Sequence, residues 1–549
     1  MFVSYLVPSF NVVFGRDSPS LLPRNFYHQF LKISRCYGIV IYAIKYMDIY
    51  CLVNQHYIII KSIWIKVSLV PYPNPQKVGK LQKKFGFFQN FLSDTSRGLL
   101  RNTRNIFMKK ILPIIVFICM LTLLLFGCDK QETLLTPQKP VTLTMWHVYG
   151  EQADSPMNRY VDDFNRTVGK EKGIIVNVTL MSNASQIGQK LVNAQKGVAG
   201  VPAMPDLFFC HNSNAQELGA NNLLNWQDVF SASELSEFVG EFVSDGMVDN
   251  SLSVLPVSKS THLLFLAGSA FDRFANAQNV TYDDLATWDG FFSVAEKYYN
   301  YSGGKPFCAL DYLMRSVELD AISQGAVDFY QDDWYKQNDT LIASYKKFAT
   351  AIAKGHIVVS DLYSNTQVMT GQTIAGISSS AAVLYYNDTI TYPDNTQEPT
   401  NLKVLPVPAS SGNKYATQAG VGLCAYKTTA QKAEAAAVFA KWFTDEKRNL
   451  DFIAQTGYMP VKIGAFGKLD SYTFKTEAFR STYSALKSTV ESCTFLSEPS
   501  TAGYFPNTYT LYSKIRELQK GLTSLYENGK TYENITDQLV DMFLTLPAA

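Results

Sequence analysis

The chain is organised around the stretch from Leu402 to Val461. It begins as LKVLPVPASSGNKYATQAGVGLCAYK, residues 402–427, and it ends as KAEAAAVFAKWFTDEKRNLDFIAQTGYMPV, residues 432–461. An apolar strand that ends in prolines is followed by a polar crossing, a glycine-flanked strand, a long amphipathic helix and a Gly-Tyr-Met-Pro stop. Strand and helix together indicate an α/β fold to which this stretch contributes.

The region from Val141 onward supplies a sheet. The run Val141-Thr-Leu-Thr-Met-Trp146 alternates as a strand, residues 154–167 have apolar side chains at helical spacing, and residues 174–180 form a second strand. A helix over 187–199 and a strand over 205–210 follow. This alternation is typical of βαβ units on a parallel sheet, which bind ligands beyond the carboxyl ends of their strands. Residues 146–149 and 211–213 lie at two of those ends.

A second group of elements follows. The segment LPVSKSTHLLFL, residues 255–266, contains two apolar runs around a short polar break. The segment TWDGFF, residues 287–292, predicts a helix start with Thr287 or Asp289 as the N-cap. Residues 369–380 carry serines at positions 378–380, and residues 511–525 and 532–546 are predicted to form amphipathic helices.

In this order the segments resemble family 1 extracellular solute-binding proteins, which are the receptors of ABC importers. The resemblance covers residues 141–461 and implies an α/β fold with two lobes, a hinge and a central ligand cleft. It places residues 141–257 plus 420–460 in the N-terminal lobe and residues 261–408 plus 461–549 in the C-terminal lobe. The family's usual aromatic residue is absent near Ser378, where serines favour hydrogen bonding.

A sugar receptor needs an aromatic platform for the apolar C–H faces of the ring and polar groups for its hydroxyls. The resemblance and this chemistry select nine candidate ligand contacts. The platform candidates are Trp146, Tyr149 and Tyr458, and the polar candidates are His147, Asn212, Ser260, Thr261, Ser378 and Gly420. Structural roles remain open for several of them: Trp146 as core packing, His147 as a satisfied buried histidine, and Ser260 and Thr261 as turn caps. Lys259 is either a phosphate contact or a solvated lysine.

The N-terminal region has the pattern of an export signal. Residues 1–107 hold fourteen basic and three acidic side chains and are either an upstream extension outside the native protein or a membrane-associated segment. Residues 108–128 form a signal peptide with a basic start, an apolar stretch and the sequence LFGC. This end resembles a lipobox, although Phe126 is bulkier than the usual residue. It predicts lipidation of Cys128, a flexible linker over 129–140, and anchoring on the outer face of the cell membrane.

The sequence argues against nucleic-acid, dinucleotide and metal sites. The net charge of +2 includes the basic N-terminal region, so the body is net acidic, which argues against nucleic acid as a partner. Residues 420–425 match G-x-G-x-x-A but alternate as a strand and do not open a helix, so no dinucleotide is expected. Cys210-His211 lacks metal-ligand spacing. We therefore expect no cofactor, no metal and no catalytic residue. Four cysteines of the body are present, and their spacing selects no disulfide pairing: Cys210, Cys308, Cys424 and Cys493.

The expected function is reversible capture of a carbohydrate, polyol or glycerophosphate by hinge closure, with delivery to an ABC transporter permease. The protein is expected to act as a monomer. Two alternatives stay open. A surface-tethered glycoside hydrolase would hold two catalytic carboxylates across the scissile bond, whereas an adhesive lipoprotein would bind no small molecule.

Overall fold

A computed structural model describes residues 133–149, 156–180, 184–326, 334–410, 413–497 and 508–546. These ranges belong to the second of two compact units of the chain, Gln131–Ala549. The predicted N-terminal extension, the signal peptide and Cys128 lie outside the described residues. Within the described ranges, no helix combines the length and the apolar character that a membrane span requires.

The first sheet has four strands in the order β14-β3-β1-β2. Strand β1 pairs in parallel with both β2 and β3, and β14 pairs antiparallel with β3. The βαβ prediction is therefore confirmed, and residues 422–425 form a strand as expected. The strands are β1 Val141–His147, β2 Ile174–Leu180, β3 Leu207–Cys210 and β14 Gly422–Ala425.

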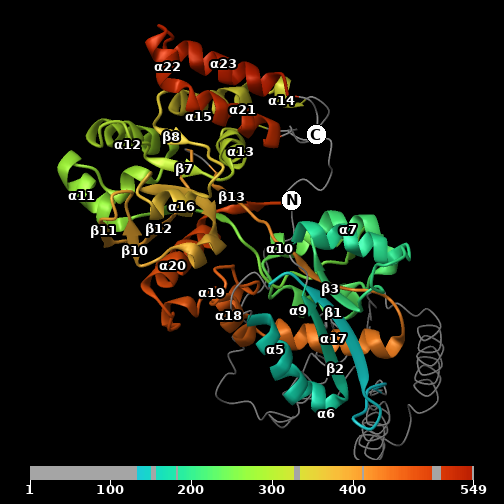
Figure 1. The fold of residues 1–549 in the computed structure, drawn as a ribbon. Coiled ribbons are helices and arrows are strands. Elements are labelled where there is room, and N and C mark those ends of the chain that lie inside the picture. Colours follow the sequence, from blue (N-terminus) through green and yellow to red (C-terminus); the bar gives the residue numbers. More distant parts are fainter. Residues whose placement is uncertain are drawn as a thin grey trace, which may run out of the picture. The chain divides into compact units, whose positions relative to one another are not determined.

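Helices cover this first sheet. Helix α5 lies in the connection from β1 to β2, and α7 leads from β2 to β3. Helix α17, which belongs to the stretch 402–461, packs on β1 (Figure 1). Helix α17 begins at the N-cap Thr429, whose side chain accepts a hydrogen bond from the Lys432 amide. The helices are α5 Pro156–Phe164, η2 Asn165–Gly169, α6 Lys170–Lys172, α7 Ala184–Gln195, α8 Asn212–Leu218 and α17 Ala430–Phe443.

A series of short elements leads from the first sheet to the second. They are η3 Ala220–Asn222, η4 Trp226–Asp228, α9 Ala232–Leu235, α10 Gly240–Asp245, β4 Met247–Val248 and β5 Ser251–Leu252. The chain then crosses along residues 254–261 as an extended segment held by isolated bridges. The two apolar runs of the sequence thus become this crossing segment and the strand after it.

The second sheet has five strands in the order β12-β6-β9-β7-β8. Strands β7, β8 and β9 run parallel, whereas β6 is antiparallel to both of its neighbours. The carboxyl ends of β7, β8 and β9 therefore lie at the same edge as the start of β6. The strands are β6 His262–Leu266, β7 Cys308–Leu310, β8 Ile357–Val358, β9 Ala375–Ser379 and β12 Lys403–Pro406.

One helix around the second sheet, α12, begins at a residue that the sequence predicted as its cap. The Thr287 side chain accepts from the Gly290 amide and is the N-cap of α12, so Thr287, and not Asp289, has that role. The helices are α11 Gly268–Gln278, η5 Tyr282–Leu285, α12 Trp288–Tyr301, α13 Leu313–Ser323, α14 Trp334–Gln337, α15 Asp339–Ala353, α16 Ser364–Met369 and η6 Ser380–Tyr385. A hairpin of β10 Thr389–Thr391 and β11 Gln397–Pro399 follows.

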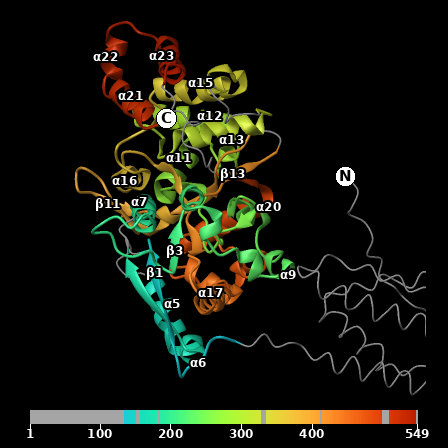
Figure 2. The ribbon, with the colours of Figure 1, turned by 90° about the vertical axis from the view of Figure 1, so that its right-hand side faces the viewer.

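The C-terminal segments add one strand and several helices to the elements described so far. Strand β15 pairs in parallel with β13, α20 packs on β12, and α21 and α23 pack together, with α23 also on α15. Both ribbon views show α21–α23 in red beside α15 (Figure 2). The elements are β13 Tyr415–Thr417, α18 Glu446–Ile453, α19 Ile463–Phe466, η7 Leu469–Ser471, α20 Glu477–Ser492, β15 Thr494–Leu496, α21 Thr508–Lys520, α22 Leu522–Glu527 and α23 Tyr532–Leu544.

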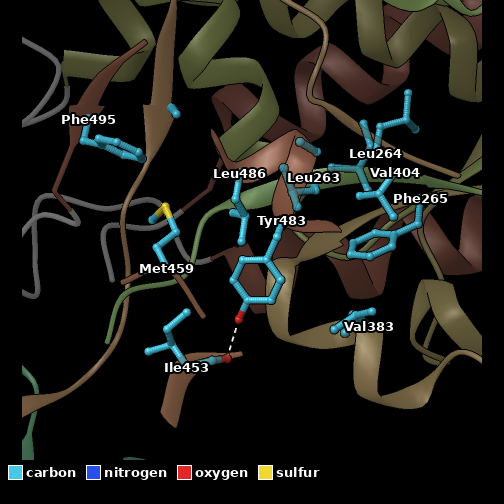
Figure 3. Close-up of a cluster of buried hydrophobic side chains, with 14 of the residues drawn as sticks. Leu263, Leu264, Phe265, Val383, Val404, Ile453, Met459, Tyr483, Leu486 and Phe495 are labelled. Carbon is cyan, nitrogen blue, oxygen red and sulfur yellow. Dashed lines mark hydrogen bonds between the residues drawn. The ribbon is translucent and has the colours of Figure 1, made fainter. Parts of the chain in front are cut away.

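Three segments meet where the chain passes between the sheets. Lys259 bridges to Met459, and Ser260 bridges to Ala419. The Tyr483 hydroxyl of α20 donates to the Ile453 carbonyl at the end of α18, as Figure 3 shows among the surrounding apolar side chains. The same hydroxyl lies 2.9 Å from the carbonyl oxygen of Tyr458. Buried contacts of this kind join the elements of the two sheets into one body.

Gly457 is required at this meeting point. Its φ is +73°, a left-handed conformation that other residues rarely adopt. A Cβ atom there would also lie 2.8 Å from the Ser380 carbonyl oxygen and 2.7 Å from the Val383 Cγ1 atom of η6. The Gly-Tyr-Met-Pro stop therefore allows the end of α18 to approach η6 closely.

Candidate ligand-binding site

A polar cavity of about 380 Å³ lies beyond the carboxyl end of β3. Four places in the chain build it: the β3–α8 turn with α8, the end of α10 with the start of β4, the crossing residues 418–420, and Ser497 after β15. We call it the amide pocket. Its lining residues are His211, Asn212, Ser213, Gln216, Ser244, Asp245, Met247, Gln418, Ala419, Gly420 and Ser497.

Two side-chain amides give the pocket its character. The Asn212 Nδ2 group donates to the carbonyl oxygens of Asp245 and Met247, at 2.7 and 3.0 Å. The Gln418 Nε2 group donates to the Glu241 carbonyl at 3.1 Å. Because carbonyl acceptors fix both amide orientations, the oxygens Asn212 Oδ1 and Gln418 Oε1 are identified; both are buried and accept no hydrogen bond from any described residue. A buried acceptor without a partner is costly, and a hydroxyl group or a water molecule is a donor of the kind that these oxygens lack.

Lys259 has a different role from both that the sequence suggested. Its side chain is buried, and its ammonium group forms an ion pair with Asp245, which lines the pocket. The lysine is therefore neither solvated nor free for a phosphate. Because each charge compensates the other at low exposure, breaking the pair would leave an uncompensated charge.

A second polar and aromatic region lies at the edge of the second sheet. Tyr312, Tyr363 and Tyr385 follow the carboxyl ends of the parallel strands β7, β8 and β9, and they are 43%, 69% and 53% exposed. We call these three residues the tyrosine edge. Exposed aromatic rings with a polar tip suit the C–H faces and hydroxyls of a sugar.

Asp311 connects the loops that carry this edge. Its carboxylate accepts from the Ser364 amide at 2.7 Å, from the Ser364 hydroxyl at 3.1 Å and from the Ser378 hydroxyl at 2.6 Å. These bonds join the ends of β7 and β9 to the start of α16. Burial raises the pKa of Asp311, while the three hydrogen bonds act in the opposite direction. The net result is a carboxyl group that fixes the loops and does not act as a free ligand contact.

The ring of His262 packs against the ring of Tyr312. The two rings are stacked, with centroids 4.9 Å apart and planes inclined by 9°. Burial, together with the nearby Arg315, lowers the pKa of His262 to about 3, so the imidazole is neutral. The stack places one face of Tyr312 against the protein.

The crossing segment borders both regions. Ser260 pairs with Ala419 of the amide pocket, and Thr261 accepts a hydrogen bond from the Ser380 amide at 2.8 Å. The next residue, His262, supports the tyrosine edge. The carboxyl edges of the two sheets are therefore joined by three consecutive residues.

The predicted aromatic residues of β1 are buried. Trp146 packs with Phe208 and Ile187 in a core beside the first sheet, which is the packing alternative left open above. Tyr149 is also buried, and its hydroxyl lies 2.9 Å from the Ser258 hydroxyl. Tyr458 is half-buried and meets Tyr149 edge to face at 6.2 Å. Trp146 and Tyr149 thus form no accessible platform in this structure.

His147 is a satisfied buried histidine. Its Nδ1 atom accepts from the Tyr149 amide at 3.2 Å, so the proton lies on Nε2, which is 3.1 Å from Asn158 Oδ1. Burial lowers the pKa of His147, and the contact with Asn158 opposes this shift. The side chain fixes the end of β1.

The remaining predicted residues divide between the two regions. Asn212 and Gly420 line the amide pocket, and Gly420 has a φ of +131°, outside the usual range of other residues. Ser260 pairs with Ala419, while Thr261 Oγ1 is buried and has no partner among the described residues. The Ser378 hydroxyl donates to Asp311, which gives it a structural partner in this structure.

Several pocket and edge residues were missed from the sequence. Tyr312, Tyr363 and Tyr385 stand outside the motifs that carried the resemblance, whereas Gln418 lies within the stretch 402–427 but was not selected as a ligand contact. The rule that ligands bind beyond strand ends would have selected Tyr312, which follows Leu310 by two residues. The described residues contain no group of three or more His, Cys, Asp or Glu side chains placed to hold a metal ion.

Comparison with solved structures shows the same two-lobe fold. The cyclic alpha-maltosyl-1,6-maltose binding protein of Arthrobacter globiformis matches with a TM-score of 0.52 and 16% identity, over 74% of this chain and 99% of that chain. The sugar-binding protein MalE of Xanthomonas citri matches with a TM-score of 0.53 and 15% identity, over 74% and 96%. UgpB of Mycobacterium tuberculosis, solved with glycerophosphocholine, matches with a TM-score of 0.51 and 15% identity, over 73% and 98%. Among curated proteins no match was found.

A family model gives the stronger assignment. The model described as "Bacterial extracellular solute-binding protein" matches residues 159–471, which is more than half of the chain and includes the whole opening stretch. The predicted family and the predicted two-lobe fold are both confirmed. The family consists of binding proteins, in agreement with the expectation that the chain is not an enzyme. The chain belongs to the family of bacterial extracellular solute-binding proteins.

Proposed function

We propose that this protein captures a carbohydrate or polyol outside the cell and delivers it to the permease of an ABC transporter. The single observation that carries the choice of ligand is the pair of buried, unpartnered amide oxygens of Asn212 and Gln418, both on residues that line one cavity. Neutral ligands rich in hydroxyl groups supply donors to such acceptors without introducing a charge. The solved sugar receptors of the same fold are consistent with this choice.

A phosphate-bearing ligand is less well supported. UgpB binds glycerophosphocholine, but the described lining residues of the amide pocket include no lysine or arginine. The nearby Lys259 is neutralised by Asp245. A phosphate there would meet two amide oxygens and a carboxylate, all of which repel it.

Catalysis on a glycoside is not supported. The described lining of the amide pocket contains a single carboxylate, Asp245, which is committed to its ion pair. Hydrolysis of a glycosidic bond requires two carboxyl groups across the bond. Asp311, near the tyrosine edge, is engaged in three hydrogen bonds.

Capture is proposed to occur by rotation of two lobes. We assign residues 141–257 plus 420–460 to one lobe and residues 261–408 plus 461–549 to the other as part of this proposal; the bridges Lys259–Met459 and Ser260–Ala419 lie near the proposed boundary. A ligand that contacts the amide pocket and the tyrosine edge together would favour the closed form, because only that form allows both sets of contacts. The closed form would be recognised by the permease.

Anchoring is also part of the proposal. We infer that residues 108–128 direct export, that Cys128 is lipidated, that residues 129–140 link the anchor to the body, and that the receptor is a monomer. Intact mass of the membrane-extracted protein tests the first three points, because cleavage before Cys128 with acylation gives a defined mass. An unmodified N-terminus upstream of Cys128 would refute them.

Titration calorimetry against monosaccharides, disaccharides, polyols and glycerophosphate tests the ligand class. We expect one-to-one binding of a neutral member of this panel and weakening by at least tenfold in Gln418→Leu, which keeps the approximate size but removes the acceptor. Tyr509→Ala on α21 is the matched control on an unrelated exposed surface. Exclusive binding of glycerophosphate would contradict the choice of ligand.

A further inference from the structure

Two buried cysteines lie next to each other on one face of the first sheet. The Sγ atoms of Cys210 and Cys424 are 3.6 Å apart, although the residues are separated by 214 positions in the chain. Cys210 is opposite Gly422 and Cys424 is opposite Phe208 in the antiparallel pair β3–β14, so the two side chains occupy diagonal positions on one face. Both belong to the core that contains Trp146 and Phe208.

The other described cysteines have no such neighbour. The Cys308 thiol in β7 donates to the Ala309 carbonyl at 3.5 Å, and Cys493 lies 3.6 Å from the Ser492 hydroxyl. Among the four cysteines of the described ranges, only Cys210 and Cys424 are in contact with each other. The structure thus selects one pairing where the sequence allowed several.

We propose that Cys210 and Cys424 form a disulfide in the exported protein. The sulfur atoms must approach from 3.6 Å to about 2.0 Å. Because the two residues are diagonal partners on neighbouring strands, this requires rotation of both side chains and a small adjustment of the β3–β14 pair. Each thiol releases one proton, and the pair transfers two electrons to a disulfide oxidant, which is reduced to two thiols as the new S–S bond forms. The inference rests on the proposed export, because such bonds persist in oxidising compartments.

The burial of the pair determines when the bond forms. Both cysteines are fully buried, so an oxidant has no direct access to them in the folded sheet. Oxidation therefore has to take place before β14 packs against β3, or while it does so, because this pairing buries both thiols. Burial also raises the pKa of Cys424, which slows later exchange. The finished bond should resist reductants until the protein unfolds.

The bond would also fix two walls of the amide pocket. Asn212 follows Cys210 by two residues, and Gly420 precedes Cys424 by four. Linking β3 to β14 holds these walls at their separation and closes a long loop in the unfolded chain, which stabilises the folded state.

Peptide mapping of the full chain provides the test. The chain is refolded with oxidised glutathione and digested without reductant, which removes any dependence on export in a cell. We expect a linked peptide pair containing Cys210 and Cys424 that separates on reduction, with a combined mass gain of two hydrogen atoms. The link should persist in Cys493→Ala and be absent from Cys424→Ala.

Thermal unfolding supplies a second readout. Full reduction under denaturing conditions followed by refolding in reductant should lower the Tm by several degrees in the natural protein and in Cys493→Ala, but not in Cys424→Ala. Recovery of both cysteines as free thiols after glutathione oxidation, or a link from either one to Cys308 or Cys493, would overturn the proposal. Sugar affinity is measured separately on each oxidised sample, so a failure of the ligand proposal does not affect the outcome.

Discussion

Replacing Asp311 with alanine would release the loops of the tyrosine edge. The substitution removes the acceptor of three hydrogen bonds and leaves the Ser364 amide and the hydroxyls of Ser364 and Ser378 without it. A hydrogen bond to a charged group contributes about 1.5–3 kcal/mol, and bonds that share one carboxylate are not additive. We therefore expect Asp311→Ala to lower the free energy of unfolding by about 3–4 kcal/mol.

Asp311→Asn is the matched control because it preserves size and shape. The remaining oxygen can accept from the Ser364 amide, and the new NH₂ group can donate to the two serine hydroxyls, which act as acceptors when they rotate. The expected loss of unfolding free energy is about 1 kcal/mol or less. Urea unfolding followed by tryptophan fluorescence measures both variants.

The sugar affinity of the two Asp311 variants tests whether the tyrosine edge takes part in binding. Calorimetry under conditions where each variant is folded should show at least a tenfold loss of sugar affinity in Asp311→Ala, because Tyr312 and Tyr363 lose their fixed positions, and a loss below threefold in Asp311→Asn. Equal stability of the two variants would refute the role of Asp311 as the connection between these loops. Unchanged affinity in Asp311→Ala would refute the role of the tyrosine edge.

Three further predictions concern single positions. The pKa of His262 is about 3 in the folded state and about 6.5 in the unfolded chain. The free energy of unfolding should therefore fall by about 1.4 kcal/mol for each unit of pH as the pH decreases from about 6.5 to about 3. In His262→Phe, urea unfolding measured over this pH range should show a weaker pH dependence. Tyr363→Ala should weaken sugar binding about tenfold by calorimetry without changing stability, whereas equal effects of Tyr363→Ala and the control Tyr509→Ala would contradict a stacking role. Gly457→Ala should lower the Tm, since its Cβ would lie 2.8 Å from the Ser380 carbonyl oxygen; an unchanged Tm would show that η6 moves away at little cost.

The first sheet was predictable because its signal is local. The alternation over Val141–His147 reflects a strand with one more exposed face, whereas Gly422–Ala425 is buried throughout and was indicated by its flanking glycines. The capping role of Thr287 is local for the same reason. The order of such segments was enough to indicate the family.

The candidate site was less predictable because its contacts are distant in sequence. Tyr312, Tyr363 and Tyr385 follow the ends of β7, β8 and β9, whose alignment depends on a strand register that no short motif specifies. Ser378 appeared suited to a ligand because it is a serine near a strand end, but its hydroxyl donates to a carboxylate 67 positions away. The orphaned oxygen of Gln418 depends on where its amide group donates, so only the folded chain shows it.

The proposed function requires that this receptor reversibly binds a neutral, hydroxyl-rich ligand at the amide pocket. The most direct measurement is titration calorimetry of the natural protein and Gln418→Leu with the best sugar or polyol of the panel, followed by chromatographic recovery of the ligand. We expect one-to-one binding by the natural protein, at least tenfold weaker binding by the variant, and recovery of the ligand unchanged. Equal affinity of the two proteins, or recovery of a hydrolysed sugar, would contradict the proposed function.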